Sequence, residues 1–324
     1  MPNSTQAIVV EVEIEGDDTT KAVKGKPIKQ KREPVKLIKK ALRPTDKVNS
    51  TIFDKLSQKK ALQTDGSFKY ALQTGTGKGG QIGLVYTIVS EISKAEEDAA
   101  GAIRKTRPLT EFDKIIHAAV GTLYYYCRRK EMTVNQIYTF IHGDGVKASA
   151  FQLSKINDSL TKMAMTRVYI DNEKEIGVLE GYKPFRHDES LLSFRRDSFV
   201  GGDSRIILNT EPILFKFAIQ RKQITAIPIE VLQIPLNKNE GNLAINDYLI
   251  SRVTAAKRGK VSRKVLYKTL FDKCAISDKT QRRRAKETIN TLLNHYVKSG
   301  FIQDYATEKD GIFLFLEESK NCPL

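Results

Sequence analysis

A run of cations at residues 282–286 is the part of the sequence best suited to chemistry. Arg282, Arg283 and Arg284 are consecutive, and Lys286 follows after one alanine. Arginine can make two hydrogen bonds to a guanine edge, and both arginine and lysine neutralise phosphates. The run therefore predicts a surface that binds DNA. The candidate contact residues of this segment are Lys279, Thr280, Gln281, Arg282, Arg283, Arg284, Lys286 and Glu287.

These residues belong to a predicted helix over residues 278–299, which Ser277 or Asp278 is expected to cap. Its apolar residues recur every three or four positions, which is the spacing of one buried helix face. They are Ala285, Ile289, Leu292, Leu293 and Tyr296. The residues that should project away from this face, at roughly 100° per residue, are Thr280, Arg283, Arg284, Glu287, Asn290 and Thr291.

The positions around the helix suggest different roles for its charged residues. Arg283 and Arg284 are the candidates for two-bond contacts with guanine, and Glu287 for accepting a hydrogen bond from cytosine. Arg282 falls close to the apolar face. We expect it to pair with an acid or to reach a phosphate. The alternative for the whole run is a merely solvated helix face.

The elements around this helix have the order of a winged helix-turn-helix. Residues 261–315 are predicted to form a helix, a turn, the longer helix, and two short strands joined by residues 308–311. In such domains the second helix enters the major groove with its N-terminal turns. The segment before it carries cations that we expect to contact phosphates. These are Lys257, Arg258, Lys260, Arg263 and Lys264.

The same order of elements occurs earlier in the chain, which indicates an internal repeat. Residues 132–138 (MTVNQIY) align with residues 261–267 (VSRKVLY) at an offset of 129. Residues 156–171 align with residues 289–304 at an offset of 133, so the second copy is expected to have a turn that is four residues longer. The alignment pairs Val168 with Phe301 and Asp171 with Asp304. A helical segment precedes each copy, at residues 110–129 and 243–257.

The first copy has fewer cations on its corresponding helix. Its candidate DNA contacts are Lys147, Lys155 and Lys162. Because Ser154 and Asp158 lie among them, this mixed face suits weaker DNA contact or a protein interface. The Gly201-Gly202-Asp203 sequence between two apolar runs predicts the hairpin that completes the first wing.

Length and composition predict two domains behind an N-terminal extension. Residues 1–50 are rich in lysine and poor in large apolar side chains, so we expect a disordered basic arm. Residues 51–108 are expected to form an extension with short strands at residues 68–72 and 82–89. Residues 213–217 and 227–234 are short strand or helix candidates. The predicted fold class is α+β, with tandem winged helices at residues 109–215 and 216–324.

The charge of the chain is unevenly distributed. The net charge is +16, and the isoelectric point is about 9.6. Residues 251–300 hold 14 Lys and Arg against three acidic residues, and residues 21–60 have the same balance, so each block carries +11. The rest of the chain is therefore mildly acidic. Two basic blocks favour a polyanionic partner, while the alternative is a lysine-rich protein that is merely well solvated.

No pattern in the sequence indicates catalysis, a metal or a cofactor. The chain contains no His-x-His sequence, as a metal-dependent nicking enzyme would need, and no CxxC pair. The glycine-rich segment around Lys78 lacks the first glycine and the Ser or Thr of a P-loop, so ATP binding is not expected. We therefore expect a protein without enzymatic activity and without a cofactor.

Nothing in the sequence predicts a membrane span or a secretory signal. No run approaches the ~20 apolar residues of a spanning helix, and the N-terminal segment has no basic region before its short apolar patch. The three cysteines are far apart in the sequence. A cytoplasmic location is expected.

Two consecutive winged helices, the second more basic, resemble the theta-type plasmid and phage replication initiators of the Rep superfamily. The resemblance covers roughly residues 109–317. It depends on the run at residues 224–229 ahead of the helix at 243–257, and on the helix at 278–299 followed by Gly300-Phe301-Ile302.

The resemblance implies a sequence-specific initiator that binds double-stranded DNA at repeated origin sequences (iterons) through its second winged helix. The first winged helix would serve dimerisation in an autorepressing form and auxiliary DNA contact in the initiating monomer. The implied partners are a host initiator, helicase or primase. The alternatives are a winged-helix transcription regulator, which would use the same surface, and a protein that coats DNA with little sequence preference.

The first unit also carries more large apolar residues than one small core needs. We expect the surplus to form an exposed patch and a dimer interface. These residues are Phe112, Ile115, Ile116, Phe140 and Phe151.

Overall fold

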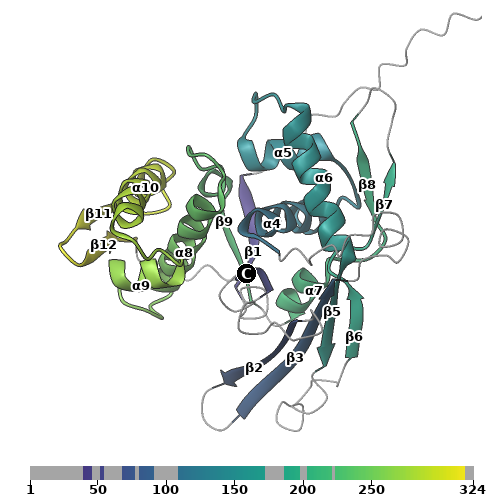
Figure 1. Cartoon of the computed structure of the whole chain (residues 1–324), viewed down its shortest axis with the longest axis horizontal. Helices are drawn as coiled ribbons and strands as arrows, with labels where there is room; N and C mark the ends of the chain where they lie inside the picture. The colour runs from purple at the N-terminus through teal and green to yellow at the C-terminus, as the bar shows by residue number, and fades with distance from the viewer. Residues whose placement is uncertain are drawn as a thin grey trace, which may run out of the picture. The chain divides into compact units, whose positions relative to one another are not determined.

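The computed structural model describes residues 39–45, 52–54, 68–76, 80–90, 109–171, 186–197, 203–220 and 223–317 (Figure 1). Within these ranges the helices are combined with four small antiparallel sheets. The protein is thus of mixed helix-and-sheet class, as the sequence predicts. In the same ranges, the model has no helix that is both long and apolar enough for a membrane crossing.

The C-terminal unit follows the element order that the sequence predicts. Its elements are α8 (Glu240–Lys257), β10 (Lys264–Leu266), α9 (Tyr267–Lys273), α10 (Lys279–Lys298), β11 (Asp304–Thr307) and β12 (Gly311–Phe315). In its sheet, β12 lies between β10 and β11. The five apolar residues predicted to line the inner face of α10 are all buried. Of the two predicted caps, Asp278 is the one observed, and its carboxylate accepts from the backbone N–H of Gln281 at 2.8 Å.

The preceding unit has the same kinds of elements (Figure 1, teal to green). They are α4 (Glu111–Tyr125), β4 (Glu131–Thr133), α5 (Val134–His142), α6 (Ala150–Met165), β7 (Phe194–Asp197) and β8 (Arg205–Leu208). In its sheet, β8 lies between β4 and β7. The strands of the predicted hairpin are therefore confirmed, while Gly201 and Gly202 lie outside the described residues.

The three helices of this first unit begin at strong local signals. Thr110, Thr133 and Ser149 each accept a hydrogen bond from the backbone N–H three residues later. In each case the side chain at that later position returns a bond to the cap, which completes a capping box. These reciprocal bonds satisfy N–H groups that a helix start otherwise leaves free, so the starts are set by local sequence.

One offset, the value of 133 that the sequence predicts for the later half of the repeat, relates part of the two units, whereas the starts of α4 and α8 and the starts of α6 and α10 differ by 129. The offset of 133 relates the start of β4 at Glu131 to that of β10 at Lys264, and the start of α5 at Val134 to that of α9 at Tyr267. Ile156 and its partner at the same offset, Ile289, are both buried. The predicted offset of 129 for the first half and the longer second turn are therefore wrong. The two offsets differ by four residues, which is close to one helical turn. A shift of one turn keeps the apolar residues of a short helix on the same face, so the sequence alone does not distinguish the two alignments.

The match of Val168 and Asp171 to Phe301 and Asp304 is also wrong. These two residues belong to β5 (Thr166–Asp171), which lies in a separate sheet of order β2-β3-β5-β6. The strand that corresponds to β11 in the first unit is β7, because each lies at the edge of its sheet and pairs with the last strand. A pattern of alternating apolar residues cannot distinguish these strands, because it does not encode the pairing partner.

The separate sheet joins the N-terminal extension to the first unit. Strands β2 (Phe68–Thr76) and β3 (Gly80–Ser90) pair with each other, and β3 also pairs with β5. The fourth strand is β6 (Arg186–Ser190), which pairs with β5. The strands predicted at residues 68–72 and 82–89 are thus confirmed, and both are longer than predicted. Residues 77–79 of the glycine-rich segment lie outside the described residues.

A strand from the predicted disordered arm contributes to the core. β1 (Lys40–Pro44) pairs with β9 (Ile224–Pro228), and Ala41 is fully buried. The prediction of disorder is therefore wrong for residues 40–44, because burial and pairing compensate for the ordering of this segment. The other residues of the predicted arm lie outside the described ranges, apart from Lys39 and Thr45 at the two ends of this strand.

The segment between the two units contains two short helices. The candidate at residues 213–217 belongs to helix α7 (Ile213–Gln220), and β9 is followed by the 3-10 helix η2 (Ile229–Val231). The predicted boundary between residues 215 and 216 therefore falls inside α7.

Candidate nucleic-acid interface

The N-terminal half of α10 presents its polar residues to solvent. All eight contact candidates of this segment are exposed, from Lys279 to Glu287. Their exposure follows from the buried stripe on the opposite face of the same helix. Thr291 is also exposed, as predicted. Asn290 is half-buried, so its predicted outward position is wrong. It lies in the second half of α10, a helix that packs against α8.

Arg283 and Arg284 are the cations best placed to receive a ligand. Both are exposed, and neither has an ion-pair or hydrogen-bond partner for its guanidinium among the described residues. Because their five N–H donors each face water, a planar acceptor such as a guanine edge can replace that water without breaking a protein contact.

Two neighbouring cations lie over aromatic rings of α9. The guanidinium of Arg282 lies 5.8 Å from the ring centroid of Phe271, and Nζ of Lys286 lies 4.4 Å from that of Tyr267. The predicted position of Arg282 near the apolar side is confirmed, but its observed neighbour is a ring rather than an acid. These cation–π contacts orient the side chains and leave their donors exposed to solvent.

The five cations before α9 fall into two groups. Lys260 and Arg263 are exposed, and the described residues offer them no acidic partner. Lys257 lies over the ring of Phe301, with Nζ at 4.8 Å from the centroid, and the guanidinium of Arg258 donates to Thr225 Oγ1. Only Lys260 and Arg263 match the prediction of freely available phosphate contacts.

Lys264, the last of these five cations, is neutralised by acids of the β11–β12 hairpin. Its Nζ lies 2.7 Å from a carboxylate oxygen of Glu308 and 3.0 Å from one of Asp310. Hydrogen bonds to Glu308 and Asp310 raise the pKa of Lys264, and the bond from Lys264 lowers the pKa of Asp310. The charge of Lys264 is therefore already compensated in this structure, so Lys264 is less available to a phosphate than Lys260 and Arg263.

Besides Lys298 at the end of α10, three exposed lysines of the C-terminal unit were absent from the predicted contacts. Lys268 and Lys273 lie on α9, and Lys309 lies in the turn between β11 and β12. The signal for Lys309 was visible, because it stands in the predicted turn. Lys268 and Lys273 could have been found only by assigning the faces of a helix too short to show a clear period.

On α6 of the first unit and just before it, the predicted cations have different surroundings. Lys147 and Lys155 are exposed, as expected for contacts with a ligand. Lys162 instead lies 2.5 Å from the carboxylate of Asp113, whose side chain is only 2% exposed. Lys162 therefore compensates a buried charge of α4 and is less available to a ligand than Lys147 and Lys155.

The apolar patch predicted for the first unit is mostly absent. Ile115, Ile116 and Phe140 are buried in the core, and Phe112 packs partly against it. The only exposed member of the predicted set is Phe151, whose side chain is 68% accessible. The prediction assumed that α4 buries only one face, so the apolar residues of its other faces were expected at the surface. In the structure α4 is buried around most of its circumference.

Two further cations of the first unit, Arg195 and Arg196, are exposed on β7. The guanidinium of Arg196 donates to the backbone carbonyl of Asn157 at 3.2 Å and to Thr161 Oγ1 at 3.1 Å, so β7 is attached to α6. Sequence analysis missed both arginines, although they stand in the predicted hairpin.

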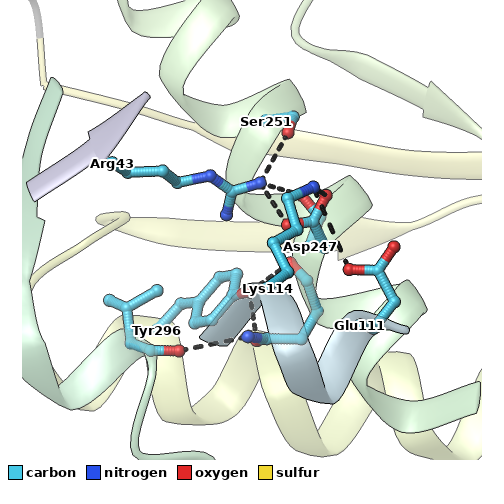
Figure 2. Close-up of polar contacts among 8 residues, drawn as sticks. Arg43, Glu111, Lys114, Asp247, Ser251 and Tyr296 are labelled. Atoms are coloured by element: carbon cyan, nitrogen blue, oxygen red, sulfur yellow. Dashed lines mark hydrogen bonds and ion pairs between the residues drawn. The ribbon is translucent and has the colours of Figure 1, made fainter. Parts of the chain in front are cut away.

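A buried ionic cluster connects the two units (Figure 2). Asp247 of α8 accepts hydrogen bonds from Arg43 of β1 and from Lys114 of α4, the latter at 2.8 Å. Arg43 also donates to Ser251 Oγ at 3.1 Å. The side chains of Arg43 and Lys114 are each only 10% exposed. β1, α4 and α8 are thus held together by one carboxylate.

Burial and charge shift two carboxyl groups of this cluster in opposite directions. Burial, reinforced by the charge of Asp247, raises the pKa of Glu111 to about 8, against the opposing effect of Lys114. Burial also opposes the ionisation of Asp247, but Arg43 and Lys114 hold its pKa below the ordinary value. At neutral pH Asp247 is therefore the charged member, and Glu111 is largely protonated.

The described part of the chain has no group of three or more His, Cys, Asp and Glu side chains that could hold a metal ion. The chemistry available at its basic surfaces is recognition of an anion through hydrogen bonds and charge.

Comparisons with known proteins give a limited result. No family model matches the sequence, and no curated protein matches it. The fold is similar to two crystal structures of domains 2 and 3 of RctB. One has a TM-score of 0.42 at 16% identity and covers 70% of this chain and 76% of that chain. The other, a selenomethionine derivative, has a TM-score of 0.39 at 13% identity, over 76% and 89%.

Because the TM-scores and the sequence identities of both structures are low, the likeness carries no argument about the function of this chain.

Proposed function

We propose that the chain is a replication initiator that binds double-stranded DNA in a sequence-specific manner. Each unit is a winged helix, with α10 and α6 as the helices that enter the major groove. The protein binds repeated origin sequences in the cytoplasm, promotes origin opening and recruits a host initiator, helicase or primase. Part of the population dimerises and represses the gene for the protein.

The observation that carries this proposal is the free pair Arg283 and Arg284 at the start of α10. Both are exposed without a protein partner among the described residues, on a helix whose other face is buried. Arginines that only interact with water would not need to be held on a helix packed against the core. Held by a packed helix, they lose less freedom on meeting a guanine edge.

Other cations support the proposal by offering phosphate contacts that carry no sequence information. In the C-terminal unit these are the exposed residues Lys260, Arg263, Lys268, Lys273 and Lys309. Binding that uses several of them releases counterions and weakens steeply as salt rises.

The tandem arrangement favours an initiator over a winged-helix transcription regulator. Two units with one element order, joined by the Asp247 cluster, present a basic helix, α10, and a helix of mixed charge, α6, from one chain. A single chain with two different DNA-binding units is expected to bind a DNA repeat that is continuous and not palindromic. A regulator would require only one such unit per subunit and a palindromic operator.

The proposal is tested first by selecting duplexes from a random library with the full-length chain. Arg283→Ala and Arg284→Ala should each lose about 1–3 kcal/mol on the selected duplex and little on random DNA, as expected for base contacts. Lys260→Ala should weaken both kinds of duplex and reduce the salt slope by about 1. The matched control is Lys298→Ala, exposed at the other end of the same helix.

Equal losses on selected and random DNA for the arginine variants would limit these residues to phosphate contact. Failure to select any duplex would refute sequence-specific binding altogether.

The initiator role is tested in cells. A plasmid without its own initiator should be maintained when it carries both the gene and the selected duplex in tandem copies. It should be lost when the gene encodes Arg284→Ala. Repression of a reporter without plasmid maintenance would identify the protein as a transcription regulator instead.

A further inference from the structure

The offset of 133 that relates β4 to β10 and α5 to α9 also assigns a counterpart in α6 to most residues of α10. Three buried pairs support the register, since both members of each pair lie in the core. They are Ile156 with Ile289, Leu160 with Leu293, and Met163 with Tyr296. In this register α10 begins one turn earlier than α6, and Phe151, in the first turn of α6, corresponds to Arg284, while Ala150 corresponds to Arg283.

Phe151 is exposed to a degree unusual for a large apolar side chain. It is 68% accessible, the highest value among the large apolar residues exposed in the described ranges. Nζ of Lys155 lies 4.6 Å from its ring centroid, which fixes the ring beside a positive charge. Burial of an aromatic ring stabilises a folded protein or a complex, and the exposed ring of Phe151 does not contribute in this way. A partner that covers the ring would therefore be bound more tightly.

The surroundings of Phe151 are positively charged. Lys147 and Lys155 are exposed just before and on α6, four residues on either side of Phe151 in the sequence. An apolar ring among cations fits a ligand that is both anionic and locally apolar. In the major groove of DNA, the C5-methyl group of thymine is the apolar feature of the base edges, and phosphates flank it.

We propose that α6 enters the major groove beside the α10 site and that Phe151 packs against the methyl group of a thymine. Lys147 and Lys155 contact the flanking phosphates. This inference rests on the proposed function and adds a base preference to it. The second unit reads guanine through Arg284, and the first unit reads thymine through the residue at the equivalent position.

The test uses the full-length chain and the duplex that it selects from a random library. Each thymine is replaced singly by deoxyuridine, which removes the methyl group and keeps the base pair. At one or two positions the affinity should fall about fourfold, the effect of leaving one methyl group unburied. For Phe151→Ala, the same deoxyuridine should cause no further loss.

Two variants serve as controls. Tyr126→Ala removes another exposed aromatic side chain of the same unit, 53% accessible, and should keep the full deoxyuridine effect. Arg284→Ala should also keep it, and should instead lose its sensitivity to replacement of guanine by 7-deazaguanine. Circular dichroism should be unchanged for Phe151→Ala, because the ring is not part of the core.

The inference is overturned if no deoxyuridine position lowers affinity, or if Phe151→Ala retains the full effect. It is likewise overturned if Phe151→Ala converts a dimer to a monomer in sedimentation without changing the deoxyuridine effect, since the ring then belongs to a protein interface. If the protein in these cases still selects a DNA duplex, and if that selection depends on Arg284, only the inference about Phe151 fails and the proposed function is retained. Failure of selection itself would instead remove the proposed function.

Discussion

Asp247→Asn should destabilise the protein strongly, because it removes the one negative charge that Arg43 and Lys114 share. Asparagine keeps the shape of the side chain and can still accept hydrogen bonds. It leaves Arg43 without its neutralising partner and Lys114 with only Glu111, whose carboxyl oxygen lies 3.9 Å away, although both cations have side chains only 10% exposed. Those cations cannot reach bulk water without opening the contact between β1, α4 and α8.

The size of the effect follows from burial. Removing one partner of a buried ion pair costs about 3–5 kcal/mol. The side chain of Asp247 is 23% exposed, so some water reaches the cluster and the lower end of about 3 kcal/mol is expected. With a urea dependence of about 3 kcal/mol per molar, the unfolding midpoint should fall by about 1 M.

Urea unfolding at pH 7, followed by circular dichroism, measures this loss. The matched control is Asp310→Asn, which weakens the exposed pair with Lys264 and should cost far less, because water screens that pair. A combined replacement by Arg43→Met, Lys114→Met and Asp247→Leu should recover most of the loss, because an apolar cluster leaves no buried charge unpaired.

The pH dependence gives a second check. The pKa of Asp247 is lowered in the folded state, so its stabilising effect is present above the unfolded pKa near 3.8 and is lost as pH falls through the folded value. The difference between wild type and Asp247→Asn should therefore shrink in strong acid. If Asp247→Asn costs no more than Asp310→Asn at pH 7, solvent screens the cluster and the reasoning from burial is refuted.

Three further variants have effects that follow from single contacts. Because the folded state raises the pKa of Glu111 from 4.5 to about 8, the stability associated with this group is full below pH 4.5 and is lost as pH rises through 8. Glu111→Gln should thus gain thermal stability over wild type between pH 5 and 9, and a constant difference would contradict the shift. Lys162→Met should cost about 3 kcal/mol in urea unfolding, since Asp113 stays buried without its cation, and it should leave salt-dependent DNA binding unchanged. Gly311→Ala would place a methyl group 2.5 Å from the carbonyl oxygen of Val265, so it should lower the melting temperature; an unchanged melting temperature would mean that the strands of this sheet can move apart.

Local features of the sequence were sufficient to predict the elements that present the C-terminal basic face. The extent of α10 and its buried stripe were predicted correctly, and its cap, Asp278, is one of the two candidates that the sequence offered. Each depends on side chains within four residues of one another, where helical geometry alone decides what meets. The strands at residues 304–307 and 311–315 were predictable for the same reason, since a short turn brings them together.

The state of individual cations could not be predicted from their neighbours in the chain. Lys162 is paired with Asp113, 49 residues away, and Lys264 with acids of the β11–β12 hairpin. Arg284 has no such partner among the described residues. A basic residue type indicates a positive charge, but whether that charge is available depends on which acid the fold brings close to it.

The sequence by itself determined the helix and strand periods, the repeated order of elements and the concentration of charge around α10. Only the tertiary structure decided that β1 pairs with β9 and that Asp247 joins the two units. It also decided that β5 belongs to the sheet with β2, β3 and β6 and not to the sheet of the first unit. Arg43 and Asp247 are 204 residues apart. Each contact at such a separation closes a long loop, and the loss of chain entropy on closure is offset only by the packing of the intervening elements. No local sequence pattern contains that information.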